Sequence, residues 1–201
     1  NIHSLIASPT PGIYHKGGGT KTTMRIRTYR SGDIATLVSI QQTSARFDDL
    51  KTMNEADFAR LLAQSASRFS DNVFLITDDD DEVNTWGQGE TLEGVEGEVV
   101  GYTILYPSKD EHAYHFRCYG TVLPEHRHRS AGYALLLCAM NHARIQSLNI
   151  LAEARQQELP VYFEAELPTH DASAEQLARA CELEVSDEPV QPGLRLYRTE
   201  L

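Results

Sequence analysis

The chain has 201 residues, of which 41% are hydrophobic and 23% are charged. That length and balance are typical of one globular domain that can bury a core. The formal net charge of −11 argues against a nucleic-acid partner, because phosphate backbones attract basic surfaces. The apolar run at 134–140 is far too short to cross a bilayer, so we expect no membrane span.

Cysteine usage and the start of the chain bear on the compartment. Cysteines stand at 118, 138 and 181, odd in number and widely spaced, which favours reduced thiols over a disulfide framework or a zinc site. No charged-then-apolar leader is recognisable, so a cytoplasmic protein is expected. His126 and His128 lie among arginines whose charge opposes a cation, and no metal site is expected there.

The first part of the chain divides into an extension and the start of a folded domain. Residues 1–23 contain prolines and three consecutive glycines and lack sustained periodicity, which indicates an extension. We expect the domain to cover 24–201. Alternating residues predict a strand at 24–29, after which Ser31-Gly32-Asp33 caps a helix. Residues from 53 onward predict a second helix.

The rest of the chain alternates strands with helices. Strands are expected at 73–76, 99–106, 114–123, 161–163 and 194–198, and helices from about 130 and at 172–183. The pattern of the first of these helices runs on towards 158, before Pro160 stops it. Five carboxylates at 78–82 are typical of a solvated hairpin loop. A contact with calcium or a polyamine is the alternative for that run.

Residues 122–136 lead from a strand through a basic loop into a helix. The first backbone N–H groups of a helix have no partner within it, and its macrodipole adds partial positive charge. Small residues from Ser130 on let the backbone approach an anion, and Arg127 and Arg129 add charge-assisted donors. The stretch therefore predicts a phosphate site. A polar turn before an ordinary helix is the alternative.

At these residues the chain resembles the GNAT superfamily of N-acetyltransferases, whose signature is Arg/Gln-x-x-Gly-x-Gly/Ala between a strand and a helix. Arg127, Ser130 and Gly132 fall on the signature positions, with Ser130 in place of the first glycine. Periodicity alone predicts a mixed α/β domain. The resemblance implies the specific fold over 24–201, a GNAT-like mixed, mostly antiparallel central sheet flanked by helices.

The resemblance also implies an activity, the transfer of an acetyl group from acetyl-CoA to a primary amine of a small molecule or peptide. In the family, a bulge in the strand before the loop frees backbone amides for the pantetheine arm and the thioester oxygen. That position carries over to Val122 and Leu123. The implied cofactor-binding residues are Val122, Leu123, Arg127, His128, Arg129, Ser130, Ala131 and Gly132. Dimers are common in the family, so a homodimer is a further expectation.

Acetyl transfer needs a base that takes a proton from the acceptor's ammonium group. GNAT enzymes use carboxylates or histidines on the central strands, without one fixed position. The candidates here are Glu164 and Glu166, which share a face of one strand, and His115 on the strand before it. Glu164 is the preferred base. The alternatives are a solvated strand end for Glu166 and an exposed edge for His115.

The proton donor for the departing thiolate is harder to assign. Many GNAT enzymes use a tyrosine in an Asn-x-x-Ala-x-x-Leu-Tyr pattern, but here Asp171 opens the pattern and Ala178 replaces the tyrosine. Water, Tyr133 or Tyr197 are the remaining sources. The missing tyrosine favours a second hypothesis, a non-catalytic acyl-CoA-binding module of GNAT fold. One half of a two-domain acetyltransferase is a third.

Overall fold

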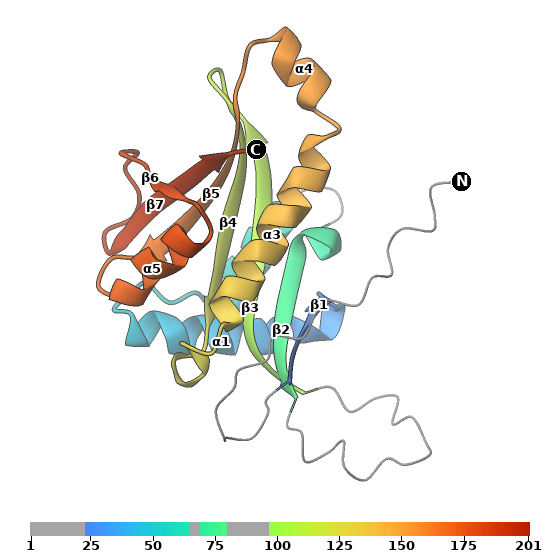
Figure 1. Ribbon diagram of the computed structural model, residues 1–201. Helices are drawn as coiled ribbons and strands as arrows, with labels where there is room; N and C mark the ends of the chain where they lie inside the picture. The colour runs from blue at the N-terminus through green and yellow to red at the C-terminus, as the bar shows by residue number, and fades with distance from the viewer. Residues whose placement is uncertain (1–22, 65–68, 80–96) are drawn as a thin grey trace.

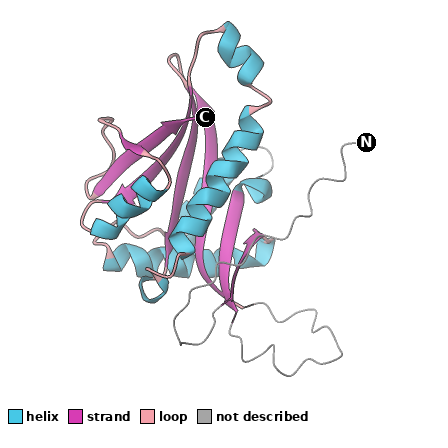
Figure 2. Ribbon diagram, viewed as in Figure 1, coloured by secondary structure: helices cyan, strands magenta, loops and turns pink. Residues whose placement is uncertain are grey.

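The computed structural model describes residues 23–64, 69–79 and 97–201, drawn as ribbons in Figures 1 and 2. The strands are β1 (Thr23–Thr28), β2 (Val73–Asp79), β3 (Glu98–Lys109), β4 (Tyr114–Val122), β5 (Val161–Pro168), β6 (Glu184–Val185) and β7 (Leu194–Glu200). The helices are α1 (Ile34–Phe47), α2 (Glu55–Gln64), α3 (Ala131–Ser147), α4 (Leu151–Gln156) and α5 (Ala172–Ala180). The expected extension lies outside the described residues except for Thr23, and so do residues 80–82 of the acidic run.

The described strands form one seven-stranded sheet in the order β1-β2-β3-β4-β5-β7-β6. Strands β4 and β5 run parallel, and the other neighbouring pairs are antiparallel. The expected mixed, mostly antiparallel sheet is therefore confirmed. Strand β6 was not expected, because two residues are too few to show an alternating pattern.

Helices cover both faces of the sheet (Figure 1). Helices α3 and α5 lie on one face, where Leu136 of α3 and Phe163 of β5 belong to one buried cluster. Helices α1 and α2 lie on the other face, where Phe58 of α2 meets Tyr102 of β3 edge to face, with ring centroids 5.5 Å apart. Burial of these apolar faces is what fixes the helices on the sheet.

The helix after the basic loop is shorter than its apolar pattern predicts. Helix α3 ends at Ser147 and a separate helix begins at Leu151, so the expectation of one helix towards 158 is wrong. The Ser147 hydroxyl donates to the carbonyl of Arg144 at 2.8 Å, a local bond that competes with the helical ladder. The turn between the two helices lets Ile150 pack against the core.

Strands β4 and β5 separate partway along their length. Their pairing runs from Tyr114 with Val161 to Cys118 with Ala165 and then stops. Beyond that point β4 stays paired with β3, and β5 stays paired with β7 as far as Pro168. The two strands therefore diverge as the arms of a V, and each arm is supported by its other neighbour.

The bulge expected in β4 lies elsewhere. The register between β3 and β4 is unbroken up to Val122, so that expectation is wrong. The irregularity falls between β2 and β3, where Ile76 pairs with Gly101 but Thr77 pairs with Val99. Val100 is the extra residue, and its carbonyl accepts the N–H of Leu123 at 2.8 Å.

Candidate functional site

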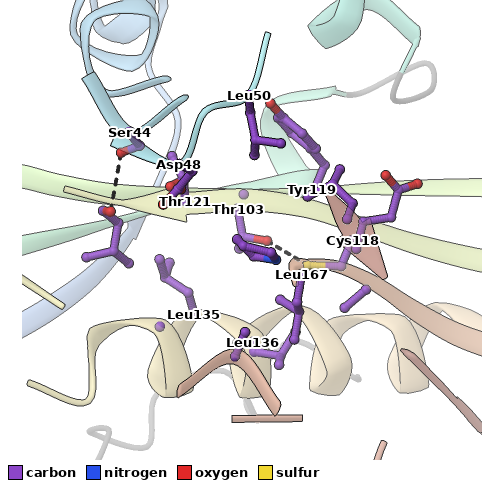
Figure 3. Close-up of a pocket in the computed structure, with 18 of the residues that line it drawn as sticks. Ser44, Asp48, Leu50, Thr103, Cys118, Tyr119, Thr121, Leu135, Leu136 and Leu167 are labelled. Atoms are coloured by element: carbon purple, nitrogen blue, oxygen red, sulfur yellow. Dashed lines mark hydrogen bonds between the residues drawn. The ribbon is translucent and has the colours of Figure 1, made fainter. Parts of the chain in front are cut away.

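A cavity of about 890 Å³ opens between the two arms of the V, a size common for small-molecule sites. It is lined by residues 118–122 of β4 and 165–168 of β5, the end of α1 and the loop before α3. Figure 3 shows Leu135 and Leu136 of α3 on one side and Asp48, just after α1, on the other. The expected loop and the ends of both central strands therefore meet at one place.

The diverging part of β4 offers backbone N–H groups to the cavity. In an antiparallel ladder, alternate residues point both backbone groups away from their partner strand. Because Leu123 donates to Val100 of β3, the residues that point away from β3 are Gly120 and Val122. Both line the cavity on the side where β5 has left. Val122 lines the cavity, whereas the Leu123 amide donates to Val100 inside the fold.

Gly120 is a site residue that the sequence analysis missed. A Cβ at this position would lie 2.3 Å from the Tyr102 carbonyl oxygen and 2.8 Å from the Thr103 Cα, both backbone atoms of β3. Only glycine therefore lets β4 lie this close to β3. A glycine inside an otherwise alternating strand is the signal that could have identified it.

The loop before α3 has the conformation of an anion-binding loop. His128 has φ of 61° and Ser130, the N-cap of α3, has φ of 67°. Such left-handed turns before a helix point successive N–H groups into one concavity. The Ser130 side chain caps none of the described residues, so it does not accept from the first amides of α3. Ala131 is 1% exposed as a whole residue, so its side chain packs inside the fold.

The two arginines of the loop have different surroundings. Arg127 donates from Nη1 and Nη2 to the two carboxylate oxygens of Asp48, each at 2.7 Å, and from Nε to the Val122 carbonyl at 3.0 Å. His170 Nε2 lies 3.3 Å from the same Asp48. The Arg127 side chain is 13% exposed and ties the loop to the end of α1, so its charge is already neutralised.

Arg129, by contrast, faces solvent. Its side chain is 52% exposed, and its contact with Asp78 is long, 3.9 Å between Nη1 and Oδ2. Asp78 itself lies in β2 and is 12% exposed, with Oδ2 3.1 Å from His126 Nδ1. The expectation of a solvated acidic run is therefore wrong at its first residue. Of the two loop arginines, Arg129 is the one available to a phosphate.

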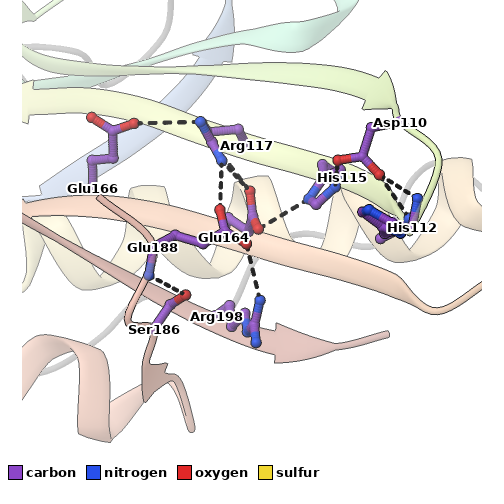
Figure 4. A network of polar contacts seen from close by, with 10 residues as sticks. Asp110, His112, His115, Arg117, Glu164, Glu166, Ser186, Glu188 and Arg198 are labelled. Carbon is purple, nitrogen blue, oxygen red and sulfur yellow. Dashed lines mark hydrogen bonds and ion pairs between the residues drawn. The ribbon is translucent and has the colours of Figure 1, made fainter. Parts of the chain in front are cut away.

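Glu164, the preferred base, lies away from the cavity. Its side chain is fully buried and accepts bonds from Arg117 Nε at 3.1 Å and Nη2 at 2.9 Å. His115 Nδ1 lies 3.0 Å from the other carboxylate oxygen, and His115 Nε2 lies 3.1 Å from Asp110 (Figure 4). Neither Glu164 nor His115 lines the cavity. The preference for Glu164 is corrected here, because the parallel pairing of β4 and β5 encloses it.

Glu166 occupies the cavity wall instead. It follows the last residue of β5 that pairs with β4, and its side chain is 18% exposed. Burial raises the pKa of Glu166, although the nearby Arg117 guanidinium opposes that shift from 3.9 Å. A carboxyl group with a raised pKa in a cavity is the arrangement typical of a general base.

The possible proton donors also differ in position. Ala178 is fully buried and packs in the cluster that joins α5 to the sheet, so it presents no acid to the cavity. Tyr197 is 4% exposed and belongs to the same cluster. Tyr133, in the first turn of α3, lines the cavity and is half-buried. It is the better placed of the two tyrosines considered from the sequence.

Comparisons with known proteins show similarity in structure rather than in sequence. No family model and no curated protein matches the chain. Among solved structures, a GNAT-superfamily phosphinothricin acetyltransferase from Sinorhizobium meliloti, in complex with acetyl-CoA, has a TM-score of 0.59 at 15% identity, covering 89% of this chain and 88% of that one. A GNAT-family acetyltransferase from Streptococcus pneumoniae has a TM-score of 0.54 at 14% identity, covering 89% and 99%.

Ard1 from Thermoplasma volcanium is similar to the same extent, with a TM-score of 0.55 at 15% identity, covering 89% of this chain and 97% of that one. At such identities the likeness is one of fold. Within the described residues, none of the helices combines the length and the apolar character needed to cross a membrane.

Proposed function

The chain has the fold of the GNAT-superfamily acetyltransferases, and we propose that it is an acetyl-CoA-dependent N-acetyltransferase acting on a primary amine of a small molecule or peptide. The observation that carries the proposal is the V between β4 and β5, with an anion-binding loop at the end of one arm. The structure of the similar protein from S. meliloti contains bound acetyl-CoA.

The residues at the V fit coenzyme A. The left-handed loop residues and the first turn of α3 would hold the pyrophosphate, with Arg129 adding an exposed positive charge. An added Cβ at Gly132 would meet only the Leu177 side chain, at 3.6 Å, so the fold itself leaves room for a ligand there. The backbone amides of Gly120 and Val122 would hold the pantetheine arm and the thioester oxygen.

Two proton movements would then fall to side chains of the cavity. Acetyl-CoA, when bound, supplies the acetyl thioester. Glu166 would accept a proton from the acceptor's ammonium group, because its raised pKa makes it a stronger base than an ordinary carboxylate. Tyr133 would supply a proton at the sulfur, since this tyrosine lines the cavity on the α3 side.

The binding site can be tested by calorimetry with coenzyme A on Gly132→Ala and Gly132→Val. Affinity should fall more than tenfold for the valine variant, about 1.4 kcal/mol, because the β-branched side chain occupies the place of the pyrophosphate. The melting temperature should hold or rise for the alanine variant, since glycine weakens a helix. Gly32→Ala is the matched control, where an added Cβ meets nothing within 4 Å. Unchanged affinity in both Gly132 variants would remove the assignment.

One observation favours the second candidate, an acyl-CoA-binding module without catalysis. Ala178, at the position of the family's tyrosine, is sealed in the core. A module of that kind binds acetyl-CoA but releases no free thiol when amines are added. A thiol-release assay with a panel of amines, run on protein shown by calorimetry to bind acetyl-CoA, separates the two functions.

A further inference from the structure

The cavity has a chamber with aromatic walls on the α1/α2 face of the sheet. Tyr102 and Tyr106 of β3 and Tyr119 of β4 all line it, and the rings of Tyr102 and Tyr119 have centroids 6.5 Å apart. Met53 and Leu61 complete the apolar wall. An aromatic wall of this kind favours flat apolar groups and the faces of its rings attract cations.

Tyr106 has a polar group that the fold does not satisfy. Its hydroxyl oxygen is buried and has no hydrogen-bond partner among the described residues. Burial raises the pKa of Tyr106 far above the working range, so the group stays a neutral donor and acceptor. A buried hydroxyl without a partner is costly unless a ligand supplies one. The chamber therefore suits an acceptor with a hydrogen-bonding group close to its apolar body.

The charge of the chamber is set by Glu166. Arg117 is the nearest cation, but Glu164 accepts two of its N–H groups at 3.1 and 2.9 Å. A second carboxylate, Glu188, lies 3.6 Å from the same guanidinium (Figure 4). The charge of Arg117 is thus neutralised by carboxylates that belong to the fold. Arg117 therefore contributes little attraction for a carboxylate on an incoming molecule.

Two other cations near the cavity lie at its outer rim. Lys51, in the loop between α1 and α2, is exposed. The Arg60 side chain is 71% exposed and lies 3.2 Å from Asp57. Charges so well hydrated contribute little to holding a ligand inside the chamber.

We propose that the acceptor is a primary amine with no carboxylate next to the amino group, carried on an aromatic or similarly flat apolar body. Its ammonium group would lie against the tyrosine faces and Glu166, and its body against Met53 and Leu61. The proposal rests on the function proposed above, because it names the acceptor of that same site. An α-amino acid with the same side chain would bring its carboxylate towards Glu166, which repels it.

A matched pair of acceptors tests the proposal. Thiol release from acetyl-CoA is measured with 2-phenylethylamine and with phenylalanine, which differ by the carboxylate alone. The ratio kcat/KM should be at least tenfold higher for 2-phenylethylamine. Equal or better use of phenylalanine overturns the proposal. If acetyl-CoA binds and other amines of the panel release thiol while neither of this pair does, the acceptor class is wrong and the proposed function stands. If acetyl-CoA binds and no amine of the panel releases thiol, the protein is a binding module and the proposed function fails. If acetyl-CoA does not bind, the proposed function itself fails.

A pair of tyrosine variants tests the chamber separately. Tyr106→Phe keeps the ring and removes the hydroxyl, so KM for tyramine, whose ring hydroxyl can pair with that of Tyr106, should rise severalfold. KM for 2-phenylethylamine, which has no polar group on its ring, and the affinity for coenzyme A should stay unchanged. Tyr114→Phe is the control, since its hydroxyl is also buried without a partner but lies outside this cavity. An equal effect of both variants on KM would show that the chamber does not hold the acceptor.

Discussion

The two halves of the β4–β5 pair share one sequence pattern and have opposite properties. In the paired half, Glu164 is fully buried and bonded to Arg117 and His115. In the open half, Glu166 on the same face lines a cavity, and burial raises its pKa. The difference arises because parallel pairing brings Arg117 and His115 against the first carboxylate. The second lies beyond the paired residues, with Arg117 3.9 Å away. Separation of the strands thus leaves the carboxyl group of Glu166 in the wall of the cavity.

The loop before α3 repeats this contrast with the opposite charge. Arg127 is held by Asp48, whereas Arg129, two residues later, is exposed and only distantly paired. In both places, one member of a similar pair is bonded within the fold, and its neighbour lies at the cavity wall or faces solvent. Substitutions at the two members should therefore affect different measurements.

The largest effect is expected for Glu166→Gln, which keeps the shape of the side chain and removes the proton acceptor. Turnover with a good acceptor amine should fall by roughly 10²–10⁴, with the affinity for acetyl-CoA nearly unchanged. In the wild type, the rate should rise with pH through an ionisation above the usual carboxyl range, because the pKa of Glu166 is raised. Loss of that ionisation from the pH–rate profile of the variant is the decisive measurement.

Glu166→Gln should raise the stability of the fold although it lowers turnover. A carboxyl group whose pKa is raised in the folded state destabilises the fold once pH rises through that pKa. Glu166→Gln should therefore melt at a higher temperature than the wild type at pH 7, and the difference should shrink as pH falls and Glu166 becomes protonated. A variant that loses both turnover and stability at pH 7 would contradict the contrast between the two halves.

Glu164→Gln should lower stability and leave turnover nearly unchanged, which is the reverse of the effects expected for Glu166→Gln. Removing the charge leaves Arg117 and His115 without their buried partner, at a cost of about 3 kcal/mol in the free energy of unfolding. Turnover measured well below the melting temperature should change little, since the side chain does not reach the cavity. Denaturant unfolding and thiol release, measured on the same preparation, separate the effects. A loss of turnover without a loss of stability would return the role of base to Glu164.

The sequence predicted the order of the major elements because apolar periodicity and turn residues are local signals. It also placed the basic loop between β4 and α3, since a loop of small and basic residues between a strand and a helix is a local signal. It could not rank Glu164 against Glu166, because alternation puts both on one face. The point where β4 and β5 separate decides between them, and that point depends on long-range pairing. The helix predicted from about 130 was too long, because its apolar pattern continues across the turn at 148–150.

Local sequence patterns also could not predict which residues pair with Arg127 and Arg129. Asp48 lies 79 residues before Arg127, and nothing near either residue indicates their contact. The sequence therefore gave both arginines the same expected role in binding phosphate. In the structure Arg129 is exposed and only distantly paired, whereas Arg127 joins the loop to the end of α1.

The next largest effects should distinguish these arginines. Arg127→Ala leaves Asp48, whose side chain is 4% exposed, without its main partner and should lower the free energy of unfolding by about 3 kcal/mol. Arg129→Ala should leave stability unchanged and weaken the binding of coenzyme A by about 1.5 kcal/mol. Calorimetry with pantetheine is the control, because this fragment lacks the phosphates and should bind the Arg129 variant as well as the wild type. Equal losses for both ligands would show that Arg129 does not contact phosphate.

The smallest effect is expected at Ser130, whose left-handed backbone stands where the GNAT signature has glycine. That conformation costs an ordinary residue about 1–2 kcal/mol, and glycine avoids this cost but loses about 0.5–1 kcal/mol in chain entropy. Because the Ser130 side chain caps none of the described residues, Ser130→Gly should give a net gain of about 0.5 kcal/mol. Ser39→Gly, at an exposed position inside α1, is the control and should destabilise, since the backbone there is helical. Chemical denaturation measures both variants, and a loss of stability at Ser130 would mean that its hydroxyl contributes to the loop in a way that the backbone conformation does not explain.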